Sequence, residues 1–312
     1  MNDSGKAFKL RLRTLLLGSA SKKGLLQLLC IYGVLGGLGF VFLYPVLYML
    51  SVSFMDVRTL VDSTVTWIPT APTLENYRKA MVTLDFWPGI ADSLKMTVLP
   101  ALLQTLSLAL AGYGLGRFPV PGKKLWVALA VLVFLIPAQV TMIPRYLLFN
   151  SYQMIGSIWP VYLISALGQG VKSSVFLLVY YQFFASYPRS LDEAAQLDGA
   201  GRLGVFLRIS LPMARPAMVV CFLFSFVWIW NDTTQVAQYS TGAASTLPMR
   251  LAQFVEAFNR LYSSASVSTG GALNESIRLS GTLLVIAPLL VIYATLQKQF
   301  VESLERTGIT GE

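Results

Sequence analysis

The sequence predicts an all-α, polytopic membrane protein with six transmembrane helices. Of its 312 residues, 55% are hydrophobic and only 12% are charged, about half the charged fraction of a typical soluble domain. The mean hydropathy is +0.62. Six apolar segments each approach or exceed the roughly 20 residues that a helix needs to cross a hydrocarbon core of about 30 Å.

The six segments follow one another along the chain with polar stretches between them. They run approximately over residues 25–49, 93–115, 125–148, 160–184, 217–238 and 277–300. The first is too long for the core of a signal peptide, so we expect it to be retained. Breaks in the helices are expected at residues such as Pro137 and Gly168, and in a membrane these point toward a pathway. Ordinary kinking is the alternative, because proline and glycine are common in membrane helices.

The distribution of basic residues predicts the orientation of the chain. With six crossings, fifteen Lys and Arg residues fall on the side of the basic N-terminal arm, eight fall on the other side, and Lys172 lies within the fourth span. Cytoplasmic loops carry the excess of Lys and Arg, so both termini are expected in the cytoplasm. Residues 1–24 then form a cytoplasmic arm, 25–300 one transmembrane domain with a cytoplasmic loop at about 188–213, and 301–312 a cytoplasmic tail.

The composition argues against an enzyme. The chain contains no histidine, which is the commonest general base and metal ligand. Cys30 and Cys221 both lie in apolar segments, where a thiol behaves as a small hydrophobe and indicates neither a disulfide nor a metal site. No G-x-x-x-x-G-K-[ST] phosphate loop occurs. We therefore expect no catalytic residues, metal or cofactor in this chain, and membrane topology rather than nucleic acid explains its net charge of +9.

The loop between the fourth and fifth spans reads EAAQLDGAG from Glu193 to Gly201. Residues 191–197 are predicted to form a short helix with Asp192 and Glu193 in its first turn, where carboxylates favour the positive helix end. Gly199 and Gly201 are expected to end this helix, because glycine accepts the left-handed backbone of a sharp exit. The sequence therefore predicts a compact protrusion between two spans.

This loop and its flanks resemble the cytoplasmic EAA loop of ABC importer permeases, and the chain is most similar to the smaller permease subunit of maltose-type carbohydrate importers. The segments that carry the resemblance are Gly116-Arg117-Phe118 with Pro121-Gly122, Ile136-Pro137 through Ile143-Pro144, Tyr181 to Pro188, Glu193 to Gly201, Arg208 to Pro212, Trp230-Asn231-Asp232, and the tail from Gln299 to Gly311. The resemblance implies the type I ABC importer permease fold.

The resemblance also implies a function and a set of partners. The chain would be the transmembrane permease subunit of an ATP-driven, binding-protein-dependent importer of a sugar or oligosaccharide in a bacterial cell membrane. Its partners would be a homologous second permease in a heterodimer, two ATPase subunits that bind ATP and Mg, an extracytoplasmic solute-binding protein and membrane lipid, with no nucleic acid. The residues implied in coupling to the ATPase are Glu193, Ala194, Ala195, Asp198, Gly199, Gly201 and Pro212.

Polar side chains within two spans are candidates for the substrate pathway. Trp230, Asn231 and Asp232 in the fifth span combine an aromatic face with hydrogen-bonding groups, as sugar recognition requires. Hydrogen bonding between helices is the alternative. Lys172 in the fourth span either forms a salt bridge to the second permease or contacts an acidic sugar.

Other functions remain open at the level of sequence. Within the importer class, the solute could instead be a peptide or polyamine. An ion-coupled secondary transporter would need acidic groups within the spans, and Asp232 is the main candidate. A membrane enzyme acting on lipid-linked sugar would need clustered acids or histidines. The outer segment 241–275 contains a Ser-, Thr- and Gly-rich stretch at 263–271, which predicts a flexible loop that either docks a partner or is a tolerated insertion.

Overall fold

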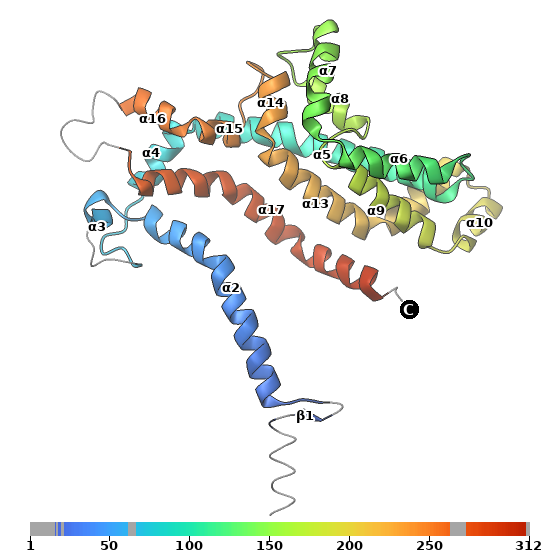
Figure 1. Cartoon of the computed structure of the whole chain (residues 1–312), viewed down its shortest axis with the longest axis horizontal. Coiled ribbons are helices and arrows are strands. Elements are labelled where there is room, and N and C mark those ends of the chain that lie inside the picture. The colour runs from blue at the N-terminus through green and yellow to red at the C-terminus, as the bar shows by residue number, and fades with distance from the viewer. Residues whose placement is uncertain (1–15, 17, 20–21, 62–66, 263–272, 310–312) are drawn as a thin grey trace, which may run out of the picture. The chain divides into compact units, whose positions relative to one another are not determined.

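The computed structural model describes residues 16, 18–19, 22–61, 67–262 and 273–309, and their regular secondary structure is almost entirely helical (Figure 1). The exception is one antiparallel pairing of two short strands, β1 (Gly18–Ser19) and β2 (Lys22–Lys23). Most of the predicted basic arm, the predicted flexible loop at 263–271 and the last three residues lie outside the described residues. The predicted all-α class is confirmed.

The chain divides into two compact units. The first comprises residues 1–78 and 274–283, and it contains α2 (Leu25–Ser53), α3 (Val57–Val61), the start of α4 (Glu75–Thr83) and the first turns of α17 (Glu275–Ile309). In this unit the Asn76 amide donates to the carbonyls of Ser53 and Met55 at 2.9 and 2.7 Å. These bonds satisfy carbonyls at the end of α2 that the helix itself leaves without partners.

The second unit comprises residues 79–273 and 284–312, and α5 (Phe86–Arg117) is its central helix. It packs against α8 (Trp159–Ala166), α9 (Ser173–Ser186) and α13 (Arg215–Asn231). Buried aromatic residues of α5, of α9 and of the segment that follows α9 pack into one cluster. They include Tyr113, Phe176, Tyr180, Phe184 and Phe206. They form the core beneath the loop that connects the fourth and fifth predicted spans.

Two glycines set the distance between α5 and α9. A Cβ on Gly116 would lie 2.9 Å from the Cβ of Phe184, and a Cβ on Gly112 would overlap the side chain of Tyr180. The two glycines are four residues apart and therefore share one face of α5. Small residues at this spacing let the backbones of membrane helices approach closely, so α5 and α9 form a tight pair.

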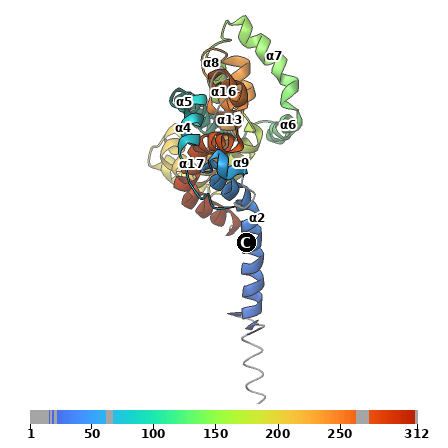
Figure 2. The same cartoon turned by 90° about the vertical axis from the view of Figure 1, so that its left-hand side faces the viewer.

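Not all six predicted spans are continuous helices. Three described helices, α2, α5 and residues Glu275–Val301 of α17, are long and apolar enough to cross a membrane, and the number rises to five if each of two bent pairs counts as one span. One bent pair is α6 (Lys123–Leu135) with α7 (Ala138–Ser151), which meet at 96° next to Pro137 (Figure 2). Proline lacks the backbone N–H that would continue the helix.

The fourth and fifth predicted spans are also divided. Residues 167–172 separate α8 from α9, and Gly168 within them has a left-handed φ of 66°. The fifth predicted span consists of α13 followed by α14 (Thr233–Tyr239), with the break at Asp232. The remaining elements of this unit are the end of α4, α17 from Leu284 onward, α10 (Ser190–Leu197), α11 (Arg202–Val205), the π-helix η1 (Phe206–Ser210), α12 (Leu211–Met213), α15 (Leu247–Ala252) and α16 (Phe254–Tyr262).

Candidate coupling site

The predicted short helix of the EAA loop is α10, with Asp192 and Glu193 in its first turn. It ends in a Schellman motif. The N–H of Ala200 donates to the carbonyl of Ala195 at 2.9 Å, and the N–H of Gly199 donates to the carbonyl of Gln196 at 3.0 Å. Gly199 has a φ of 85°, the left-handed backbone expected for it. The loop therefore forms the compact protrusion that the sequence predicts.

The other glycine of the loop has a different role from the one expected. Gly201 has φ −68° and ψ 163° and precedes α11, so the expectation of a left-handed backbone at this position was wrong. One left-handed residue, Gly199, already completes the cap. Asp198 is the exposed C-cap residue of α10. Pro212 lies in the first turn of α12, before a bend of 76° that leads into α13.

Helix α10 has one face turned outward. Glu193 and Ala194 are exposed, and Leu197 at the end of the helix is 88% exposed. Within the described part of the chain, no hydrogen bond or ion pair engages the carboxylate of Glu193. Ala195, by contrast, is buried against the chain itself. The exposed surface of α10 therefore combines apolar side chains with polar ones, Glu193 and Gln196 among them.

The inward face of α10 carries a buried ion pair. The Nε of Arg117, the last residue of α5, lies 2.8 Å from Oδ2 of Asp192, and the two side chains are only 4% and 12% exposed. The Tyr187 hydroxyl donates to Oδ1 of Asp192 at 2.6 Å. It also lies 2.7 Å from the hydroxyl of Ser210, which must act as the donor because Tyr187 has a single proton to give. We call Arg117, Tyr187, Asp192 and Ser210 the α10 anchor.

Arg117 makes further contacts with the segment between α9 and α10. Its two terminal nitrogens donate to the carbonyls of Tyr187 and Pro188 at 3.0 and 3.1 Å. Its guanidinium carbon stands 3.5 Å from the centre of the Tyr187 ring, a favourable cation–π geometry. Burial, and then the bond to Asp192, raises the pKa of the Tyr187 hydroxyl. The hydroxyl therefore stays protonated at neutral pH and remains a donor.

Sequence reasoning did not assign the α10 anchor. Asp192 was expected only to favour the positive helix end, and Arg117 only carried the family resemblance. The spacing between Asp192 and Ala195 is three residues, which places both on one face of a helix. The structure marks this face as the inward one, because Ala195 is buried while the adjacent Ala194 is exposed. No pattern in the sequence indicates that Asp192 pairs with Arg117, which lies 75 positions earlier in the chain.

The predicted pathway residues do not form one site. Trp230 is 2% exposed and stacks on Phe226 with ring centres 5.7 Å apart. Asn231 is exposed and donates to the carbonyl of Val227 at 2.8 Å. Lys172 lies outside the helices, with a left-handed φ of 55° directly before α9, and is exposed. Among these candidates, Asp232 lines the pocket described next.

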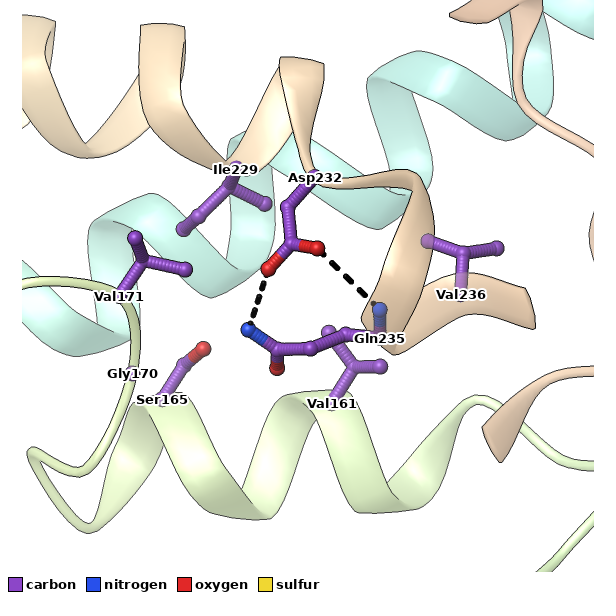
Figure 3. A pocket seen from close by; sticks show the side chains of 8 residues that line it. All are labelled: Val161, Ser165, Gly170, Val171, Ile229, Asp232, Gln235 and Val236. Carbon is purple, nitrogen blue, oxygen red and sulfur yellow. Dashed lines mark hydrogen bonds between the residues drawn. The ribbon is translucent and has the colours of Figure 1, made fainter. Parts of the chain in front are cut away.

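That pocket lies between α8 and the junction of α13 with α14 (Figure 3). It is lined by Val161, Ser165, Gly170, Val171, Ile229, Asp232, Gln235 and Val236. Its volume of about 10 Å³ has room for roughly one water molecule. The Asp232 carboxylate accepts bonds from the N–H groups of Thr234 and Gln235 at 3.0 and 3.2 Å and from the Gln235 side chain at 2.8 Å. Asp232 therefore caps α14.

Comparison with known proteins assigns the family. Residues 105–306 match the family described as binding-protein-dependent transport system inner membrane component, and this span includes α10 and the whole α10 anchor. The chain belongs to this family. With the apolar helices of the structure, the family confirms the predicted multi-pass location in a bacterial membrane.

Individual relatives match along most of the chain. Protein LplC of Bacillus subtilis is 28% identical, with 89% of this chain and 92% of the relative covered. The diacetylchitobiose uptake system permease protein DasC of Streptomyces coelicolor is 27% identical, with 86% and 92% covered. Among solved structures, a chain of a bacterial ABC transporter involved in the import of the acidic polysaccharide alginate has a TM-score of 0.69 at 17% identity, with 96% and 99% covered. The predicted permease fold is thus confirmed.

Proposed function

We propose that this chain is the transmembrane permease subunit of an ATP-driven importer of a sugar or oligosaccharide. Family membership supports the permease role. The names of several relatives support the solute class, since they refer to diacetylchitobiose, trehalose and galactooligosaccharides. The observation that carries the coupling role is the geometry of α10, which exposes Glu193 on one face while the opposite face is fixed to the rest of the chain.

The partners in this proposal follow from the family and from charge. A homologous second permease, two ATPase subunits that supply ATP and Mg, and an extracytoplasmic solute-binding protein complete the transporter. Both termini and the loop at 188–213 lie in the cytoplasm, as the excess of Lys and Arg favours. The residues facing the ATPase are Glu193, Ala194, Gly199 and their neighbours in the loop. Asp232 is engaged in capping α14, which favours the ATP-driven function over ion coupling.

The coupling role is tested by reversing the charge at Glu193. Tagged full-length chain, produced with its partner subunits, is purified, and the ATPase retained on it is measured. Loss of one member of an interfacial ion pair costs about 2–5 kcal/mol, so Glu193→Lys is expected to weaken ATPase binding by about 30-fold or more. Glu256→Lys makes the same change at an exposed residue of α16 and is expected to retain the ATPase. Full retention by Glu193→Lys would contradict the proposal.

The solute class needs a separate experiment. The assembled transporter with its solute-binding protein is placed in lipid vesicles, and ATP hydrolysis is measured with oligosaccharides, peptides and polyamines added in turn. Stimulation by oligosaccharides alone is expected. Stimulation by a peptide or polyamine would keep the permease role and replace the solute, whereas solute uptake by the purified chain without ATP would support an ion-coupled transporter.

A further inference from the structure

The α10 anchor joins four segments of the second unit, and one of them, the end of α5, lies at least 70 positions earlier in the chain than the other three. Arg117 ends α5, Tyr187 follows α9, Asp192 lies in the first turn of α10, and Ser210 ends η1. Among the described residues, Asp192 is the one residue of α10 whose side chain forms an ion pair or hydrogen bond with another segment. The polar contacts that attach the side chains of α10 to the rest of the chain are therefore concentrated at Asp192.

The anchor leads into the longest helix of this unit. Helix α5 has 32 residues, which corresponds to a length of about 48 Å. It is held tightly to α9 at Gly112 and Gly116, and the Tyr113 ring of α5 packs on Phe206 of η1 with centres 4.9 Å apart. A displacement of Arg117 must therefore displace the end of α5 together with its packed neighbours, because close-packed interiors transmit strain.

The contacts of the α10 anchor resist a displacement of α10 relative to α5. Both charges of the Arg117–Asp192 pair are shielded from water, so separating them would leave a buried charge without its partner. The guanidinium is also held by two carbonyls and by the Tyr187 ring. Ser210 is completely buried within a π-helix, a rare geometry often found at functional sites. Two side chains, Arg117 and Tyr187, thus hold the Asp192 carboxylate, and each of them is held in turn by further contacts.

We propose that the α10 anchor is a rigid joint that transmits movement of α10 to α5, with Arg117, Asp192 and Tyr187 as positioning residues. This inference rests on the proposed function, because the movement would come from the ATPase bound to the outward face of α10. The two faces of α10 then have different roles. Glu193, on the outward face, is needed for binding the ATPase, and Asp192, on the inward face, is needed for transmitting the movement of α10 to α5.

The rigidity of the joint is tested on the full-length chain alone in lipid nanodiscs. Amide hydrogen exchange of residues 190–200 is compared between the parent chain, Asp192→Asn, Tyr187→Phe and Asp198→Asn. Breaking a buried pair promotes local opening, so Asp192→Asn is expected to speed exchange by about tenfold or more, and Tyr187→Phe by a smaller factor. Asp198→Asn alters an exposed carboxylate of the same helix and is the control. Equal exchange in Asp192→Asn and Asp198→Asn would overturn the proposal.

Transmission is tested in the complex with the ATPase. Spin labels at Leu191 of α10, which lies off the face formed by Glu193, Ala194 and Leu197, and at Leu110 of α5, both exposed, report the distance between the two helices with and without ATP and Mg. The parent is expected to give one narrow distance that stays the same in both states, because α10 and α5 move together. Asp192→Asn is expected to retain the ATPase within about twofold yet give a broadened distance that changes with nucleotide.

The outcomes separate this inference from the proposed function. If the parent chain retains no ATPase, the proposed function fails, while the exchange experiment still reports on the joint. If the parent binds the ATPase but its α10-to-α5 distance changes with nucleotide, the joint is not rigid and the inference fails alone. The inference also fails if Asp192→Asn keeps the narrow, constant distance of the parent.

Discussion

Replacing Gly112 with alanine should destabilise this protein, although alanine is the better helix former. An ideal Cβ at Gly112 would overlap the Cβ of Tyr180, and it would lie 3.0 Å from the carbonyl carbon of Tyr180 and from the backbone nitrogen of Tyr181. Two of these three atoms belong to the backbone of α9, so no change of rotamer can relieve the contact. Helices α5 and α9 would have to separate by about 1 Å to restore ordinary carbon–carbon contacts.

The size of the effect follows from two opposing contributions. Overpacking a tight interface costs about 1–3 kcal/mol, and exchanging glycine for alanine within a helix returns about 0.5–1 kcal/mol. Gly112→Ala should therefore lose about 1–2 kcal/mol. Gly114 provides the matched control, because it lies in the same turn of α5 and no atom of another helix comes within 4 Å of its added Cβ. Gly114→Ala should be as stable as the parent or slightly more stable.

The assay is thermal unfolding of the purified full-length chain and both variants in one detergent at one heating rate. A loss of 1–2 kcal/mol lowers the midpoint by about 2–8 °C in a protein of this size. Gly112→Ala should show this decrease and Gly114→Ala should not. Equal midpoints for the two variants would refute the reasoning, because the close approach of α5 and α9 is what distinguishes the two positions.

Two further predictions concern polar contacts of the second unit. The pKa of Tyr187 is raised in the folded chain, so the protonated hydroxyl stabilises the fold below the unfolded pKa of about 10, and this stabilisation is lost as the pH rises above that value. The thermal unfolding midpoint of Tyr187→Phe should therefore decrease less than that of the parent between about pH 9 and 11. The same decrease with pH in both proteins would contradict this role of Tyr187. Arg250 donates to the carbonyls of Leu84 and Asp85 at 3.2 and 3.1 Å, so Arg250→Ala should lower the free energy of unfolding by about 1–2 kcal/mol in denaturant titrations. Arg260→Ala, which changes an exposed residue of α16, should leave the free energy of unfolding unchanged.

Much of the fold and of the loop could be predicted from patterns that are local in the sequence. Hydropathy marks the apolar segments because each residue contributes independently to transfer from water into lipid. Carboxylates in the first turn and Gly199 at the end define α10, because helix caps depend on residues a few positions apart. The break at Pro137 follows from a missing backbone donor. These features required no knowledge of how the helices pack.

Side-chain direction limited the same reasoning. Trp230, Asn231 and Asp232 are consecutive, and successive residues of a helix point about 100° apart, so a run of polar and aromatic letters does not imply one site. Trp230 is buried, Asn231 is exposed, and Asp232 leaves the helix to cap α14. Lys172 was expected within a span, but the chain has already left the helix there. The identity of a residue indicates its chemistry and not its surroundings.

The sequence by itself determined a helical membrane protein of the permease type with a short protruding helix between two spans. Only the tertiary structure decided that Asp192 faces Arg117 and that Glu193 faces outward, and that Gly112 and Gly116 lie against α9. The physical reason is that hydropathy, capping and proline breaks act over a few residues, whereas these contacts join residues about 70 positions apart. Such contacts depend on where the helices cross, which is fixed by the packing of all of them together.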